Sequence, residues 1–267
     1  MKRLGLILAL GLTLSACAAT TNPVDTAPPT GNAPAASGAV ANSPAAGSSA
    51  AAKASAQAPS GGSKVGTTNT FFKSWADDIG YVQYMIVIEV KNTGGKPADI
   101  HSGDQSYTIL ATDGTVLQTG NFGYSFPQVL APGQLGYYIE GGQFDQGTKL
   151  ANVGKLQPSL SYSDKDTTPT PWEFSSVKVA TDSLFGGAEV SGIVKNTDTT
   201  DATMGTVGVV LFDASGNIMG GVVDNTDVMD LRAGQSKGFK TSYPQTPKID
   251  PAAVKSFKTF GLDYSFF

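Results

Sequence analysis

The sequence predicts an all-β protein with two antiparallel β-sandwiches in tandem. Three observations support this fold class. Short apolar segments alternate with turns that contain Gly, Asn or Pro, as in sandwiches built from short strands. The whole pattern occurs twice, at a spacing of about 102 residues. Only residues 251–255 and 147–153 have the composition of a helical turn.

The duplication is visible in four blocks that keep their order along the chain. The paired blocks are residues 90–93 and 194–197, 107–117 and 209–219, 130–134 and 231–235, and 160–162 and 262–264. Lys-Asn-Thr and Leu-x-x-Gly-Gln occur in both halves. Chance similarity between turn sequences would not preserve both order and spacing, so the two halves are predicted to share one fold.

Each half contains matching strands and turns. The expected strands are 84–90, 108–110 and 135–140 in the first half and 188–194, 207–212 and 238–243 in the second. Gly114 and Gly216 indicate hairpin turns, because Gly tolerates a positive φ. The stretch 163–171 is the predicted linker, which places the two domains at residues 69–163 and 172–267.

The second half contains, in order, a strand ending in Lys-Asn-Thr, a Val-x-Leu-Phe-Asp segment at 209–213, a Gly hairpin and Leu-x-x-Gly-Gln. This order resembles the FxLYD-type immunoglobulin-like domains of bacterial surface lipoproteins, although Val and Phe replace the Phe and Tyr of the motif. The first half departs further, because residues 107–111 lack the Asp. The resemblance covers most of 84–140 and 188–243. It implies two immunoglobulin-like modules of an adhesive or structural kind, without an active site.

Residues 1–16 have the parts of an export signal. A basic start is followed by an apolar run at 4–14 that is too short to span a bilayer. The run ends in Leu-Ser-Ala-Cys at 14–17, which resembles the lipobox of bacterial lipoproteins. The resemblance implies cleavage before Cys17 and acyl chains such as palmitate on this residue, and two or three chains give stable anchoring. The alternative is a secretory signal with a cysteine near its end by chance.

The segment from Cys17 to residue 68 is predicted to be a disordered tether. Ala, Pro, Ser, Gly and Thr dominate it, and no aromatic residue occurs before Phe71. Such a composition cannot bury enough apolar surface to offset the entropy lost on folding. The predicted location is therefore extracytoplasmic, on the cell surface or the periplasmic side of a bacterial membrane, with the folded part on a flexible spacer.

Composition argues against most kinds of chemistry. The net charge of −4 and the lack of basic clusters speak against nucleic acid as a partner. One Cys and one His cannot form a disulfide or a zinc site. His101 is expected to be a loop residue without a catalytic role, and the acidic residues fall in polar turns without the spacing of a calcium loop. Trp75 and Trp172 are expected to pack in the core. No enzyme activity, cofactor or metal is predicted.

One aromatic segment differs between the halves. Phe122, Tyr124 and Phe126 alternate, so they would share a face of an extended strand, whereas the second half has Asp224 at the position of Phe122. Either the two segments differ in register, or the aromatic face is partly exposed. An exposed face would be an interaction patch. Core packing is the favoured interpretation, because aromatic residues usually carry the core of a small sandwich.

Two functions are open at the level of sequence. The leading hypothesis is a membrane-anchored, non-enzymatic binding or structural module that contacts an unknown protein or glycan of the cell envelope. The alternative is an accessory or catalytic component of a system that modifies the cell wall, with a site between the two domains. A cleft between the domains lined by acidic residues would favour the alternative.

Overall fold

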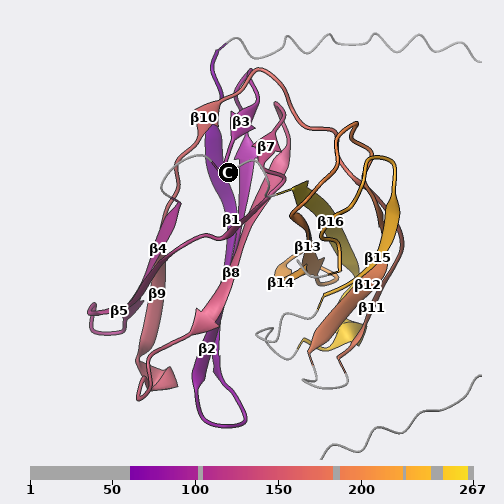
Figure 1. The fold of residues 1–267 in the computed structure, drawn as a ribbon. Helices are drawn as coiled ribbons and strands as arrows, with labels where there is room; N and C mark the ends of the chain where they lie inside the picture. The colour runs from indigo at the N-terminus through magenta and orange to yellow at the C-terminus, as the bar shows by residue number, and fades with distance from the viewer. Residues whose placement is uncertain (1–60, 102–104, 183–186, 225–226, 242–248, 264–267) are drawn as a thin grey trace, which may run out of the picture. The chain divides into compact units, whose positions relative to one another are not determined.

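The computed structural model describes residues 61–101, 105–182, 187–224, 227–241 and 249–263 (Figure 1). In this part of the chain almost every regular element is a β-strand, and the only helical elements are two single 3-10 turns. All strand pairs are antiparallel, and their sheets stack as sandwiches. The predicted all-β sandwich fold is confirmed.

The first repeat is a sandwich of two sheets. One has the strand order β1-β2-β8-β6, and the other has the order β5-β4-β9. The bounds are β1 Val65–Ala76, β2 Val82–Asn92, β4 Ser106–Ala111, β5 Val116–Asn121, β6 Tyr124–Phe126, β8 Leu135–Gln143 and β9 Val153–Ser159. Tyr84, Ile86, Ile88, Ile109 and Tyr138 are among the buried side chains between the two sheets. A small third sheet is made of β10 Ser163–Asp164, β3 Ala98–Asp99 and β7 Val129–Leu130.

The second repeat has the same arrangement with fewer strands. Its sheets have the orders β11-β12-β15 and β14-β13-β16. The bounds are β11 Glu173–Thr181, β12 Ala188–Lys195, β13 Gly205–Phe212, β14 Ile218–Asp224, β15 Ser236–Lys240 and β16 Ser256–Asp263. Val190, Val194, Val209, Leu211 and Phe239 are among the residues that fill the space between these sheets. The matching strand orders are those expected of a duplicated fold.

Turn predictions agree closely with the structure. The two stretches with helical composition contain the 3-10 turns η1 Leu150–Asn152 and η2 Pro251–Ala253. Gly114 and Gly216 have φ values of 90° and 79° and lie in the hairpins β4–β5 and β13–β14. The first strand was the element least visible in the sequence: β1 begins at Val65, inside the segment expected to be tether, and it contains Trp75.

The two repeats belong to one compact unit and share a third apolar core. Outward side chains of β2, β8 and β6 pack against outward side chains of β13, β14 and β16; the cluster is Met85, Val87, Phe126, Tyr137, Ile139, Val210, Phe212, Ile218, Val223 and Leu262. Full burial of one large apolar side chain contributes roughly 1.5–3 kcal/mol. Ten buried members therefore make the contact between the repeats a substantial part of the stability.

This shared core explains the unusual composition of two strands. A strand with one face in water alternates apolar and polar residues, whereas a strand covered on both faces is apolar throughout. In β2, Ile86 and Ile88 face the core of the first repeat while Met85 and Val87 face the second repeat. Every residue of β13 is buried in the same way. The continuous apolar runs of β2 and β13 therefore mark the strands in the middle of the stack.

Candidate functional site

The residue with the clearest predicted chemistry, Cys17, lies outside the described residues, as does the tether up to residue 60. Its lipidation stays a prediction. Within the part of the chain that the structure describes, no helix is long and apolar enough to cross a membrane. The structure therefore bears on the folded repeats and not on the anchor.

The three aromatic residues of the predicted patch do not form one exposed face. Phe122 is buried in the core of the first repeat, 5.2 Å from the ring of Tyr107 and 5.3 Å from that of Tyr138 between centroids. Phe126 is fully buried in the core shared with the second repeat, where Tyr124 stacks on it at 6.2 Å. The backbone leaves strand geometry at residues 122–123, which breaks the alternation and turns Phe122 to the other side. Core packing, the interpretation favoured by the sequence, describes Phe122 and Phe126.

Glycines of the second repeat accommodate large side chains of the first. A Cβ atom at Gly208 would lie 2.5 Å from the ring of Phe126, and one at Gly221 would lie 3.0 Å from Ile139. Because real Cβ atoms do not approach other atoms to 2.5 Å, only Gly fits beneath Phe126. The glycines of β13 and β14 thus leave space for Phe126 and Ile139 of the first repeat.

A polar network crosses the same contact. The Tyr137 hydroxyl donates a hydrogen bond of 2.6 Å to Glu89, and the Lys258 ammonium donates one of 2.5 Å to the Tyr137 hydroxyl. The ammonium also lies 5.1 Å and 5.3 Å from the ring centres of Tyr137 and Phe212, within cation–π range. Burial, together with the hydrogen bond to Glu89 and its negative charge, raises the pKa of Tyr137 well above its ordinary value. The network fixes the lateral position of the two repeats.

The repeated motifs have a structural role that is the same in both halves. The Asn92 side-chain amide donates hydrogen bonds to the carbonyls of Lys96 and Leu130, at 2.7 and 3.0 Å. The Asn196 amide makes the equivalent bonds to the carbonyls of Thr200 and Leu231, at 2.9 and 3.0 Å.

The Gln of Leu-x-x-Gly-Gln adds further hydrogen bonds between the same two segments in each repeat. Gln134 accepts a hydrogen bond from the backbone of Ala131, and Gln235 accepts one from that of Arg232. The backbone carbonyls of the same two glutamines accept from the backbone amides of Asn92 and Asn196. Both motifs therefore tie the end of the second strand to the turn before a later strand.

The single histidine takes part in local structure. The His101 ring nitrogen Nδ1 lies 3.0 Å from the Ser125 hydroxyl, and its backbone amide donates to Asp99, which forms a 3.2 Å ion pair with Lys165. Burial lowers the pKa of His101, and the nearby negative charge of Asp99 opposes this shift. Among the described residues, no group of three His, Cys, Asp or Glu side chains is placed to hold a metal ion. Asp224, which the sequence aligns with Phe122 of the first repeat, lies in β14 and is 3 % exposed.

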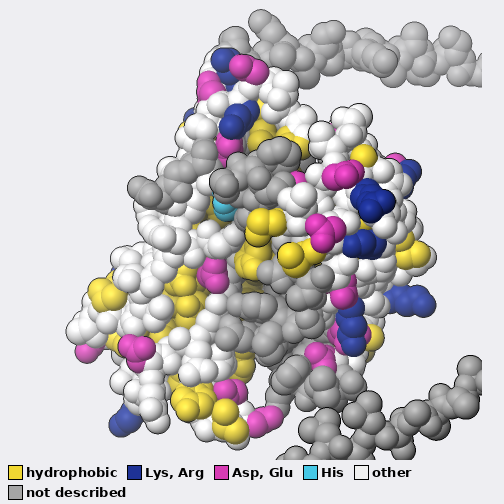
Figure 2. Space-filling view, in the orientation of Figure 1, with side chains coloured by type: hydrophobic (Ala, Val, Ile, Leu, Met, Phe, Trp, Pro, Cys, Tyr) yellow, Lys and Arg dark blue, Asp and Glu magenta, His cyan; other side chains and the backbone are white. Residues whose placement is uncertain are grey.

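A cavity with a volume of about 310 Å³ lies at the junction of the repeats. We call it the junction cleft and define it by Pro127, Val129, Trp172, Asp198, Leu262 and Asp263. Residues 168–171 of the linker and Trp172 form one wall, and the end of β16 forms another. Figure 2 shows hydrophobic side chains beside acidic ones in the region between β7 and β16. Both repeats and their linker contribute to this cavity.

The indole of Trp172 lies at this cleft in space that is open because Gly261 has no side chain. A Cβ atom at Gly261 would lie 2.1 Å from the indole, so the ring lies directly on the backbone of β16.

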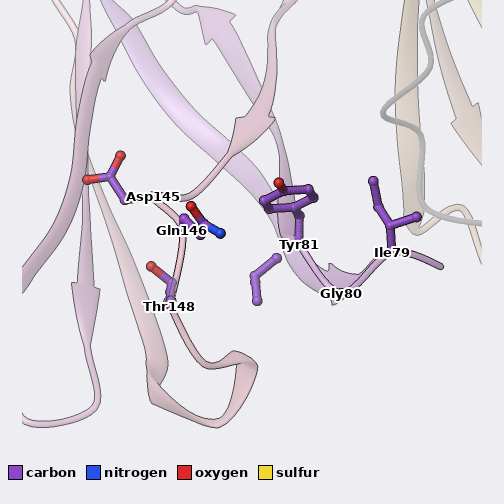
Figure 3. A pocket seen from close by; sticks show the side chains of 8 residues that line it. Ile79, Gly80, Tyr81, Asp145, Gln146 and Thr148 are labelled. Carbon is purple, nitrogen blue, oxygen red and sulfur yellow. The ribbon is translucent and has the colours of Figure 1, made fainter. Parts of the chain in front are cut away.

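A smaller cavity of about 170 Å³ lies at the β1–β2 hairpin (Figure 3). Asp145, Gln146 and Thr148 come from the loop after β8, and Tyr81 comes from the hairpin. Asp77 accepts hydrogen bonds from the backbone of Ile79 and Tyr81, which stabilises the turn. The side chain of Ile79 at this turn is 80 % exposed. The cavity is polar and shallow, and nothing in its lining converges as a catalytic group would.

The residues that join the repeats were not recognised in the sequence. The missed set is Met85, Val87, Tyr137, Gly208, Val210 and Lys258. A signal was available, because the duplicated positions of Met85 and Val87 are Glu189 and Ser191. An apolar outward face in only one copy indicates that this copy is covered there.

Comparisons with known proteins found no match: no family model, no curated protein and no solved structure is similar to this chain at a significant level.

Proposed function

We propose that this protein is a lipoprotein held on the outer side of a bacterial membrane by lipid on Cys17, and that its folded repeats act as a non-enzymatic binding or structural module of the cell envelope. The observation that carries the proposal is the sequence Leu-Ser-Ala-Cys at 14–17 directly after a basic start and a short apolar run. The docked repeats support a structural role, because their polar and apolar contacts make one unit that a tether can display.

Metabolic labelling with an alkyne analogue of palmitate tests the anchor. Cells that express the full chain should incorporate the label, and the protein should partition into the detergent-rich phase of Triton X-114. The Cys17→Ala variant should lose the label and partition into the aqueous phase. Equal labelling of both variants would contradict lipidation at Cys17.

The junction cleft supports the second candidate function, a part in modifying the cell wall. Its lining includes Asp198 and Asp263, and carboxylates are the groups that glycoside hydrolysis uses. Incubation of the full-length protein with purified peptidoglycan, followed by chromatography of released fragments, tests this candidate. Release that disappears in the Asp198→Asn and Asp263→Asn variants would establish it, and no release would remove it.

A further inference from the structure

The junction cleft has apolar walls with polar side chains set among them. Pro127, Pro171 and Trp172 supply apolar surface. Gln134 and Asp198 are among its polar residues. None of the described lining residues is Lys, Arg or His, the groups that proteins use to bind phosphate and carboxylate. Its volume, about 310 Å³, is at the lower end of the roughly 300–1,000 Å³ found for small-molecule sites. These features suit a small, neutral ligand.

The indole of Trp172 is a rigid part of this lining. Its ring lies on the backbone of Gly261, and a Cβ atom at Gly205 would lie 3.2 Å from it. The side chain also packs against the apolar core of the second repeat. Because the ring is already held in place, a ligand that stacks on it costs little side-chain entropy. The electron-rich face of an indole attracts C–H groups, which carry partial positive charge.

The side chain of Gln134, from the first repeat, supplies an oriented donor. Its Oε1 accepts a hydrogen bond of 2.8 Å from the backbone amide of Ala131, which fixes the orientation of the side-chain amide. None of the described residues accepts a hydrogen bond from Nε2 of Gln134. The two N–H groups of Nε2 can therefore donate to a ligand in the cleft.

Asp198, from the second repeat, supplies an oriented acceptor. Its Oδ1 accepts a hydrogen bond of 2.7 Å from the backbone amide of Thr199, and its Oδ2 receives none from the described residues. The backbone amide of Asp198 donates to the side chain of Asn196, as that of Gly94 donates to Asn92 in the first repeat. The turn therefore forms with or without a carboxylate, and the repeat that has one places it in the cleft.

We propose that the junction cleft binds a neutral mono- or disaccharide unit of an envelope glycan. A pyranose ring has faces of C–H groups and a rim of hydroxyl groups, each of which both donates and accepts. One face stacks on Trp172, while rim hydroxyls accept from Gln134 and donate to Asp198. Both repeats contribute these groups, so the site depends on their docking. This inference rests on the proposed function as a binding module and names its site and its ligand class.

Fluorine NMR of the full-length protein tests the proposal. The chain has two tryptophans, so labelling with 5-fluorotryptophan gives one signal each for Trp75 and Trp172, and the Trp172→Phe variant assigns them. The probes are N,N′-diacetylchitobiose, cellobiose and maltose, titrated into the millimolar range in a detergent without a sugar headgroup. We expect at least one probe to shift the Trp172 signal saturably. The Trp75 signal should stay in place, because Trp75 packs against the core shared by the repeats.

Two substitutions test the polar groups of the cleft. Gln134→Glu keeps the oxygen that accepts from Ala131 and replaces Nε2 by an oxygen, so it removes the donor. Asp198→Asn keeps the oxygen that accepts from Thr199 and replaces Oδ2 by an amide nitrogen, so it removes the acceptor. Each should weaken binding roughly 10-fold, the effect of one lost hydrogen bond.

Gln235→Glu is the matched control. Gln235 accepts the equivalent hydrogen bond from Arg232 but does not line the cleft, so its substitution should leave the affinity unchanged. Wild-type affinity in either cleft variant would overturn the proposal, as would the failure of all three saccharides to shift the Trp172 signal. A shift caused by tetraproline and by none of the saccharides would assign the cleft to a peptide and would also overturn it. Palmitate labelling at Cys17 is independent of these results, so failure here leaves the proposed anchor unaffected.

Discussion

The outward faces of the equivalent strands β2 and β12 have opposite character. Met85 and Val87 of β2 are fully buried, whereas the duplicated positions in β12 are Glu189 and Ser191, which are partly exposed. The same contrast appears between the other sheets, where Val210 and Phe212 are buried and their equivalents Thr108 and Leu110 are partly exposed. The face that meets the other repeat is apolar, and the matching face in the other copy carries polar side chains such as Glu189 and Thr108.

This asymmetry has a consequence for assembly. Contact between two different faces of a repeated unit can continue indefinitely, because each new unit leaves the same face free for the next. Here the free face of β12 carries Glu189, Ser191 and Lys195, which do not match an apolar surface. The outward face of β12 therefore lacks the apolar character that β2 has at the contact.

The largest expected effect comes from placing a charge on the covered face. Val87→Asp should lower the free energy of unfolding by at least ~3 kcal/mol, because its carboxylate would be buried without a partner. The equivalent change in the other repeat, Ser191→Asp, should stay within about 0.5 kcal/mol. Urea unfolding followed by tryptophan fluorescence measures both. Equal effects of the two substitutions would break the comparison and show that the repeats separate in solution.

The motif asparagines should behave alike in both repeats, unlike the outward faces. Asn92→Ala and Asn196→Ala should each lower the free energy of unfolding by about 2–3 kcal/mol, because each leaves two carbonyls without their amide donor. Asn121→Ala, at an exposed strand end, is the matched control and should have little effect. A large difference between Asn92 and Asn196 would contradict a shared structural role.

A smaller loss of stability is expected from a substitution at Gly208, which lies against Phe126 at the contact between the repeats. Gly208→Ala should cost about 1–3 kcal/mol of stability, because its methyl group overlaps the ring of Phe126. Gly66→Ala, where the added Cβ would meet open space, should be neutral or slightly stabilising. Phe126→Leu combined with Gly208→Ala should recover part of the loss in a double-mutant cycle. Strict additivity of the two changes would place Phe126 away from Gly208.

The smallest effect at neutral pH concerns Tyr137. Its pKa is raised in the folded protein, so its contribution to stability is complete below the unfolded value of about 10 and is lost as the pH rises above it. Stability should fall by up to about 1.4 kcal/mol per pH unit above pH 10 through this one group. Tyr137→Phe should reduce that slope, and Tyr162→Phe, at an exposed position, should not. Thermal unfolding between pH 9 and pH 11 measures both slopes.

The sequence predicted the parts of the fold that depend on local signals. Gly114 and Gly216 require a positive φ, which makes their turns visible without any tertiary information. The positions of the two 3-10 turns and the long central strands followed from composition in the same way. The edge strand β1 was missed because most of its residues before Phe71 are small and polar, as in the tether.

The contact between the repeats could not be found by treating each repeat alone. The comparison of Phe122 with Asp224 pointed to a difference, but the backbone break at 122–123 places Phe122 in its own core. The informative differences were at outward positions such as Val87 and Ser191, which become meaningful only when the faces of each strand are known. The junction cleft depends on where the linker meets β16, which no local pattern encodes.

Just before β1, Ser63 donates two hydrogen bonds, of 2.9 and 2.5 Å, to Asp164 of the small sheet β10-β3-β7. Val129 of the junction cleft belongs to the same sheet. The twelve residues of β1 then carry the chain roughly 40 Å to the hairpin that bears Ile79. The Ile79 hairpin and the small sheet β10-β3-β7 therefore lie near opposite ends of β1. A partner that bound the exposed side chain of Ile79 would therefore contact the end of β1 that is remote from Ser63 and the small sheet.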